Sequence, residues 1–170
     1  MFNKNYLKGK FVPKNPKKCL NYNGKIKNAK DIVFRSSYEK IFCNFLDLDE
    51  NVIEWGSEIV EIPYYSKTDN RRHKYITDFV FVSKNSNNII EKWLVEIKPK
   101  TQVPILNEKK QIVYPDLPKM KRLTQKRIDR WKLHCDILTK NHEKWESAKA
   151  WCKSNNYKFK VITEDELALS

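Results

Sequence analysis

The segment KYITDFVFVSKNSNNIIEKWLVEIKPK, residues 74–100, decides the fold. It contains two runs rich in Val, Ile, Phe and Trp, near residues 74–83 and 91–99, and a polar stretch of Lys, Asn and Ser separates them. Runs of this composition are typical of β-strands, and a short polar connection favours an antiparallel pair. The segment therefore predicts two paired strands of one sheet.

Charged side chains interrupt both strands. Because successive side chains point to opposite faces, Leu94, Glu96 and Lys98 share one face of the second strand. On the first strand, Asp78 falls in a row that is otherwise apolar, formed by Ile76, Val80 and Val82. A buried carboxylate needs a hydrogen bond, an ion pair or a cation, because an isolated buried charge costs several kcal/mol.

An antiparallel hairpin brings Asp78 close to Glu96, and two neighbouring carboxylates repel each other unless a cation lies between them. Magnesium takes oxygen ligands, keeps several waters and bridges carboxylates to phosphate groups. Lys98 is then placed to orient or deprotonate an attacking water, or to neutralise charge that develops on the phosphorus. This set of residues predicts metal-assisted hydrolysis of a phosphodiester.

The flanking sequence supplies the other elements. Apolar side chains at helical spacing predict a helix from about residue 36 to 47, with Glu39 beside its buried stripe. Residues 49–66 predict a turn and one or two short strands, and TDNRRHK, residues 68–74, predicts a polar hairpin-like loop. Residues 101–118 are expected to have little regular structure.

The C-terminal third predicts helices and one strand. A long amphipathic helix is expected from about Met120 to Leu138, a second helix around Trp145, and a last strand near 157–162. The element order predicts an α/β fold in which a small mixed β-sheet is flanked by helices. We expect an extended basic N-terminal arm over residues 1–30 and a single domain over residues 31–170.

The net charge of +13 favours a polyanionic partner. Residues 1–30 contain nine lysines and no acid, and a second basic cluster follows Pro118, whereas residues 39–61 are acidic. The candidate nucleic-acid-binding residues come from the two basic clusters: Lys14, Lys17, Lys18, Arg122, Lys126, Arg127 and Arg130. For any single lysine, an ordinary solvated surface is an equally good interpretation.

Several classes of protein are disfavoured by what the sequence lacks. It has no apolar run long enough to span a bilayer, so no membrane partner is expected. It contains neither GxGxxG nor GxxxxGK, which argues against a nucleotide cofactor. Its four cysteines form no CxxC pair and are expected to be reduced thiols.

The segments ITDFVF and LVEIKPK resemble the core of the PD-(D/E)XK nucleases. The resemblance implies Glu39, Asp78, Glu96 and Lys98 as catalytic residues, with Glu39, Asp78 and Glu96 as ligands of Mg²⁺ or Mn²⁺. Thr77 stands where the motif name has proline, which is not a ligand. The flanking segments FRSSYEKIF, ENVIEWGSE and VITEDEL further resemble the TnsA-type subgroup and the head-completion proteins of large myovirus-like tailed phages.

This resemblance implies a metal-dependent DNA endonuclease that acts on packaged DNA during phage head maturation, before tail attachment. It further implies portal or neck proteins as partners, a place in the head and neck region of the virion, and the host cytoplasm during assembly. Two alternatives remain open at this point. One is a structural neck or portal-binding protein without turnover, and the other is a stand-alone DNA-processing nuclease of the transposase or resolvase type.

Overall fold

The computed structural model describes residues 7–117 and 124–167, and its centre is a four-stranded mixed sheet. The strand order is β3-β6-β7-β8, with β3, β6 and β7 antiparallel and β8 parallel to β7. The bounds are Val52–Ser57 for β3, Phe79–Lys84 for β6, Ile90–Ile97 for β7 and Lys158–Ile162 for β8. The predicted antiparallel pair and the predicted last strand are confirmed, as is the mixed α/β class.

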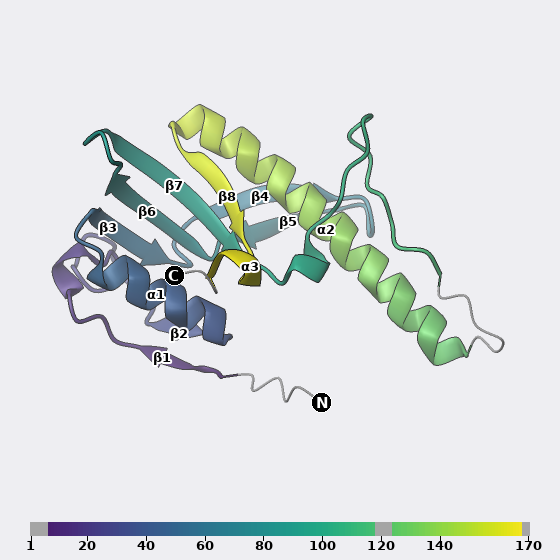
Figure 1. Cartoon of the computed structure of the whole chain (residues 1–170), viewed down its shortest axis with the longest axis horizontal. Helices are drawn as coiled ribbons and strands as arrows, with labels where there is room; N and C mark the ends of the chain where they lie inside the picture. Colours follow the sequence, from purple (N-terminus) through teal and green to yellow (C-terminus); the bar gives the residue numbers. More distant parts are fainter. Residues whose placement is uncertain (1–6, 118–123, 168–170) are drawn as a thin grey trace.

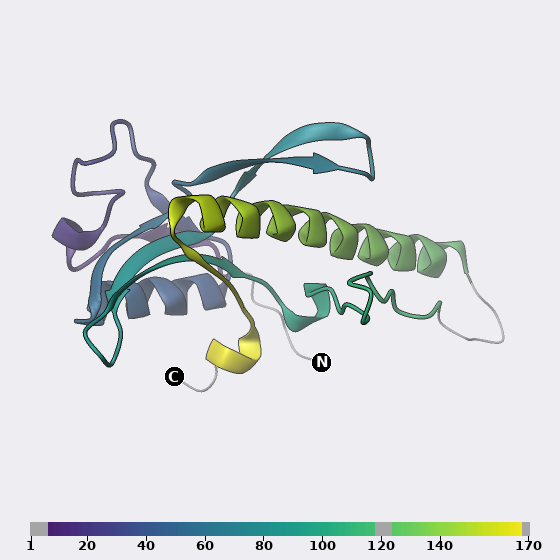
Figure 2. The same cartoon turned by 90° about the horizontal axis from the view of Figure 1, so that it is seen from above.

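Helices cover both faces of this sheet (Figures 1 and 2). Helix α1 (Ser37–Leu48) lies on one face, where Phe42, Leu46 and Trp55 belong to one buried cluster. Helix α2 (Gln125–Asn155) lies on the other face, where Leu94 and Trp145 belong to a second cluster. The sheet is thus buried on both sides.

Helix α1 forms where the apolar periodicity predicts it. The Ser36 hydroxyl accepts a hydrogen bond from the Glu39 backbone N–H at 3.1 Å, which caps the first turn. Phe42, Cys43 and Leu46 follow at helical spacing and are buried against the sheet. The predicted helix from about residue 36 to 47 is confirmed.

Helix α2 is one continuous helix of 31 residues, so the prediction of two separate helices is wrong. The residues between Leu138 and Trp145 are polar but include no Gly or Pro, and nothing in them ends a helix. The helix ends at Asn156, which adopts the left-handed conformation with φ 58°. At 1.5 Å per residue it is about 46 Å long, and its N-terminal half extends past the sheet (Figure 1).

Strands β4 (Glu61–Ser66) and β5 (Arg71–Ile76) form a separate antiparallel hairpin. The predicted polar loop 68–74 is therefore wrong beyond its first residues, because β5 begins at Arg71. The hairpin continues the β3–β6 pair, but the register changes between the pairs Ser57↔Phe79 and Glu61↔Ile76. Three residues, 58–60, oppose the two residues 77 and 78, which is a β-bulge.

This bulge divides the single strand predicted near residues 74–83. Tyr75 and Val80 both belong to the cluster on the α2 face, although strict alternation would place them on opposite faces. Ile76 is 47% exposed, so the predicted row of Ile76, Asp78 and Val80 on one face is wrong. The alternation predicted for β7 is confirmed, because Leu94 packs on the α2 face and Val95 on the α1 face.

The basic N-terminal segment is anchored on the domain. Strand β1 (Gly9–Phe11) pairs with β2 (Ile32–Phe34), and a 3-10 helix, η1, spans Pro16–Lys18. Phe11 and Cys19 are buried in the cluster on the α1 face. The lysines of residues 7–30 are therefore presented from a segment that packs against the core.

The remaining segments are short. A 3-10 helix, η2 (Lys100–Gln102), follows β7, and the expected lack of regular structure beyond it is confirmed up to residue 117. A one-turn helix, α3 (Glu164–Leu167), follows β8. In the described ranges, no helix combines the length and the apolar character needed to cross a bilayer.

Candidate active site

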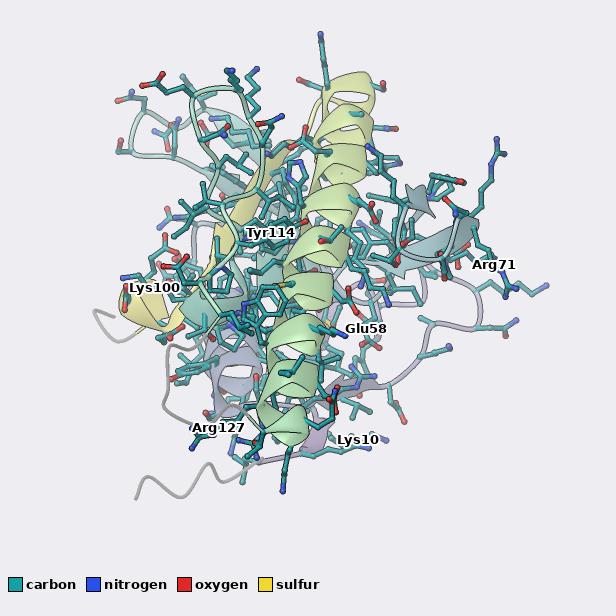
Figure 3. All side chains as sticks on the ribbon, turned by 90° about the vertical axis from the view of Figure 1, so that its right-hand side faces the viewer. Lys10, Glu58, Arg71, Lys100, Tyr114 and Arg127 are labelled. Carbon is teal, nitrogen blue, oxygen red and sulfur yellow. The ribbon has the colours of Figure 1, made fainter. Side chains whose placement is uncertain are left out.

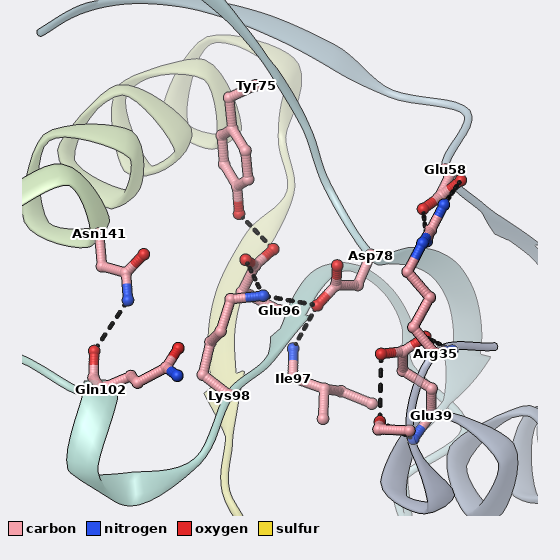
Figure 4. A network of polar contacts seen from close by, with 11 residues as sticks. Arg35, Glu39, Glu58, Tyr75, Asp78, Glu96, Ile97, Lys98, Gln102 and Asn141 are labelled. Carbon is pink, nitrogen blue, oxygen red and sulfur yellow. Dashed lines mark hydrogen bonds and ion pairs between the residues drawn. The ribbon is translucent and has the colours of Figure 1, made fainter. Parts of the chain in front are cut away.

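Asp78, Glu96 and Lys98 converge at the end of the β6–β7 pair (Figure 4). The Lys98 Nζ lies 2.8 Å from Glu96 Oε1 and 3.6 Å from Asp78 Oδ2. The Asp78 Oδ2 also accepts a hydrogen bond from the Ile97 backbone N–H at 2.8 Å. The structure thus brings together three of the predicted catalytic side chains.

The bulge sets the position of Asp78. The Glu58 N–H donates to the Asp78 carbonyl at 3.1 Å, and the Thr77 N–H donates to the Val60 carbonyl at 3.1 Å. Thr77 itself is buried. The backbone is therefore fixed on both sides of the link between β5 and β6, and the Asp78 carboxylate reaches toward β7.

Tyr75 belongs to the site but is absent from the residues predicted from sequence. Its hydroxyl donates to Glu96 Oε2 at 2.6 Å, while Lys98 contacts the other carboxylate oxygen. Glu96 is only 2% exposed, so both oxygens are fixed by partners inside the protein. Strict alternation would face Tyr75 away from Asp78, but the chain bends at Asp78 between β5 and β6, so the strand pattern gave no signal for Tyr75.

Burial and charge shift the titration of the central residues. Burial, followed by the negative charge of Glu96, raises the pKa of Asp78 to about 7, and Lys98 only partly offsets this. Burial alone would lower the pKa of Lys98, but the carboxylates of Asp78 and Glu96 outweigh it and raise that pKa. The side chains of Asp78 and Lys98 are 21% and 25% exposed, so a ligand from solvent can reach them.

Lys144 of α2 is a second cation near the site that the sequence gave no reason to select. Its ammonium lies 5.5 Å from the centre of the Tyr75 ring and 5.9 Å from that of Tyr64. Burial lowers the pKa of Lys144, with the carboxylate of Glu96 acting against this shift. The α2 face of the site is thus lined by two tyrosines and a lysine.

The raised pKa of Asp78 gives the metal-free chain a specific pH dependence. A carboxyl group that titrates near 3.8 when unfolded and at about 7 when folded keeps its proton only in the folded state between these values. The free energy of unfolding therefore falls as the pH rises through this window. We expect Asp78→Asn to gain stability relative to the wild type from about pH 4 to about pH 8. Urea unfolding in EDTA measures this difference, and a difference independent of pH would contradict the shift.

Glu39 lies near these residues but forms contacts of its own (Figure 4). Its Oε2 accepts from the Arg35 N–H at 2.8 Å, and its Oε1 lies 3.1 Å from the Ser36 hydroxyl. The Arg35 guanidinium pairs with Glu58, the first residue of the bulge. Glu39 therefore completes the cap of α1, and its catalytic role stays a prediction.

The donor set of the site fits a hard divalent cation with two protein ligands. Within residues 7–117 and 124–167, no group of three or more His, Cys, Asp or Glu side chains is arranged to hold a metal, and the role of Glu39 as a third ligand stays a prediction. Magnesium is commonly held by one or two carboxylates, with water and substrate phosphate as its other ligands. The raised pKa of Asp78 reflects in part the repulsion from Glu96 that such a cation would relieve.

The predicted nucleic-acid-binding residues lie away from this site. Lys14 and Lys18 contact Asp47 and Asp49 at the C-terminal end of α1, and Glu39 is eight residues, or about 12 Å, back along that helix. Lys17 belongs to the same turn of η1. Lys126, Arg127 and Arg130 are exposed in the first turns of α2, and Arg122 lies outside the described residues.

A cavity beside α1 does not contain the site either. It has a volume of about 460 Å³ and lies between α1, α3 and the sheet, with Phe45, Phe81 and Trp93 in its lining. None of Asp78, Glu96 and Lys98 lines it. The side chains of Asp78 and Lys98 are instead partly exposed, so a polymer that approaches from solvent can contact them.

Two comparisons with known proteins agree with this geometry. The family model for the TnsA-like endonuclease N-terminal domain matches residues 49–164, which include β3 to β8 and the three converging residues. The chain is also 32% identical over 161 residues to the head completion nuclease of Enterobacteria phage T4, covering 94% of this chain and 92% of that protein. The resemblance predicted from the sequence is confirmed, and the chain belongs to the TnsA-like endonuclease family.

Proposed function

We propose that this protein is a Mg²⁺- or Mn²⁺-dependent endonuclease that hydrolyses phosphodiester bonds of packaged DNA during phage head completion, before tail attachment. The observation that carries the proposal is the convergence of Asp78, Glu96 and Lys98 on a partly exposed surface. Membership of an endonuclease family supports hydrolysis of a nucleic acid. The printed name of the T4 relative supports the biological stage.

Each residue has a defined role in this proposal. Asp78 and Glu96 would hold the cation, and Tyr75 keeps the Glu96 carboxylate in place through its 2.6 Å hydrogen bond. A bound Mg²⁺ supplies positive charge that polarises the phosphate and lowers the pKa of a water. Lys98 pairs with two carboxylates and has a raised pKa, which supports an ammonium that binds phosphate oxygens rather than a general base.

The proposal also places the protein in the phage particle. We infer that it contacts portal or neck proteins in the head and neck region, after synthesis in the host cytoplasm. Its support is the head-completion relative, which aligns over nearly the whole chain. Tail attachment by heads that carry Glu96→Gln separates assembly from hydrolysis, because normal attachment would show that assembly does not need cleavage.

Removal of metal tests the enzymatic proposal directly. We expect the full-length chain to nick or linearise supercoiled plasmid with Mg²⁺ or Mn²⁺, and to lose at least about 10³-fold of this rate in EDTA. The loss is large because the cation would supply several kcal/mol of transition-state stabilisation. Equal cutting in EDTA would contradict the metal dependence. Lack of cutting with either metal would contradict the endonuclease proposal.

A further inference from the structure

The β4–β5 hairpin carries three exposed cations at its tip. Lys67, Arg71 and Arg72 lie at its tip, where the ladder ends with the pairs Tyr65↔Arg72 and Ser66↔Arg71. None of these three side chains forms an ion pair with any residue in the described ranges. The tip therefore has positive charge that is not neutralised within the chain.

Neither acid at the tip forms an ion pair with Lys67, Arg71 or Arg72 among the described residues. Asp69, the acid of the turn, pairs with His73 at 2.8 Å. Glu143 of α2 accepts a hydrogen bond from the Lys67 backbone N–H at 3.0 Å through one carboxylate oxygen. The guanidinium groups of Arg71 and Arg72 thus remain available for an anion from outside the protein.

The two faces of the hairpin differ in character. Ile62, Tyr64 and Tyr75 face α2 and are buried. The opposite face is exposed and carries Tyr65, which is 50% exposed, opposite Arg72. An exposed aromatic ring beside unpaired cations is a surface typical of nucleic-acid binding, since the cations contact phosphates and the ring contacts sugars or bases.

Packing holds this surface in a defined position. A two-stranded hairpin is marginally stable by itself, but here α2 packs against β4 along its inner face (Figure 2). Lys144 lies over the rings of Tyr64 and Tyr75, and so ties both strands to the helix. Arg71 pairs with the buried Ser66 and is exposed at the tip of the hairpin, where Figure 3 labels it. The cations therefore bind a ligand with little ordering cost.

The hairpin is also continuous with the active site. Its Tyr75 donates to Glu96, and Asp78 follows two residues after the end of β5. Arg72 is six residues from Asp78, or about 20 Å along an extended chain. At 3.4 Å per base pair, this separation corresponds to about six base pairs of duplex DNA.

We propose that the β4–β5 hairpin binds the DNA backbone, with Lys67, Arg71 and Arg72 contacting phosphates about six base pairs from the bond that is cut. This inference rests on the proposed endonuclease function and adds to it the surface that holds the substrate. It differs from the assignment made from charge composition, which selected lysines of η1 and the first turns of α2. Those residues are farther from Asp78 in sequence than the hairpin is. They lie at the C-terminal end of α1 and at the N-terminal end of α2.

DNA binding by full-length chains that carry Glu96→Gln tests this inference, because the substrate then stays intact. The probe is a fluorescein-labelled duplex of about 30 base pairs, and its anisotropy gives the Kd at several KCl concentrations. The test protein carries Arg71→Ala and Arg72→Ala, and the control carries Lys84→Ala and Lys153→Ala. Both pairs are exposed and both replacements lower the net charge by two, but Lys84 lies at the far end of β6 and Lys153 near the end of α2.

We expect the hairpin variant to bind about tenfold more weakly than its parent and to lose about two units of salt slope, with little change in the control. Replacing both arginines with lysine should restore the slope. Equal Kd values and slopes for the hairpin variant and the control would overturn the inference, even if the wild type cuts DNA. If the parent binds no DNA, the inference is also overturned, and loss of cutting by the wild type separately marks failure of the proposed function.

Discussion

Glu96→Gln is expected to lower the rate of DNA cleavage by at least about 10³-fold without unfolding the protein. Glutamine has nearly the shape of glutamate, and its amide oxygen can still accept the hydrogen bond from Tyr75. It cannot supply the negative charge that holds a divalent cation beside Asp78 and balances Lys98. Single-turnover cleavage of a labelled duplex in Mg²⁺ gives the rate, and thermal unfolding shows whether the fold is retained.

Glu91→Gln is the matched control for this variant. Glu91 is also in β7, and its carboxylate pairs with Lys158 at 2.7 Å on the protein surface. A surface ion pair contributes only about 0–1 kcal/mol, so this variant should cleave at about the wild-type rate. Similar rates for Glu96→Gln and Glu91→Gln would rule out a catalytic role for the carboxylate beside Lys98.

The second large effect is expected for stability. Asp47 is 1% exposed, and its carboxylate accepts hydrogen bonds from the backbone N–H groups of Lys14 at 2.7 Å and Asn15 at 3.1 Å. Asp47→Ala leaves both N–H groups without these acceptors, at about 1–3 kcal/mol each. We therefore expect the free energy of unfolding to fall by about 3 kcal/mol. Urea unfolding, with the midpoint and slope analysed together, measures it.

Glu50→Ala serves as the comparison, because Glu50 is an exposed acid close to Asp47 in the sequence. Its replacement should change the free energy of unfolding by no more than about 0.5 kcal/mol. If both alanine variants were equally stable, the hydrogen bonds that hold the η1 turn on α1 would contribute nothing measurable. The position of Lys14 and Lys18 would then need another explanation.

The sequence predicted the structure correctly wherever a single strand or helix periodicity determines which side chains share a face. Alternation in β7 correctly placed Leu94, Glu96 and Lys98 on one face, and helical spacing located α1. The α/β class and the pairing of β6 with β7 followed from the order of these elements. Three side chains of the candidate site could therefore be selected before their distances were known.

The sequence did not predict the strand register at residues 58–60 or which charged side chains are buried. The bulge consists of one extra residue in 58–60, and apolar periodicity contains no signal for one unpaired residue. Opposite this extra residue, the chain leaves the strand at Thr77 and bends at Asp78, which breaks the alternation between Tyr75 and Asp78. The hydrogen bond from Tyr75 to Glu96 was therefore missed. Charge composition identified residues 39–61 as acidic, but it gave no sign that the fold buries Asp47 under backbone N–H groups of the lysine-rich turn. Composition gives the net charge of a chain, but it does not show which charged side chains are buried and which are exposed.

Thr77 and Asp78 form a short link between the hairpin and the catalytic strands. Backbone hydrogen bonds to Val60 and Glu58 hold this link at both ends. Two residues separate the tyrosine that orients one carboxylate from the aspartate that supplies the other. Any displacement of the hairpin is therefore transmitted to both acids together. Lengthening this link by a single residue would uncouple them, whereas the surface turn at residues 85–88 has room for insertions.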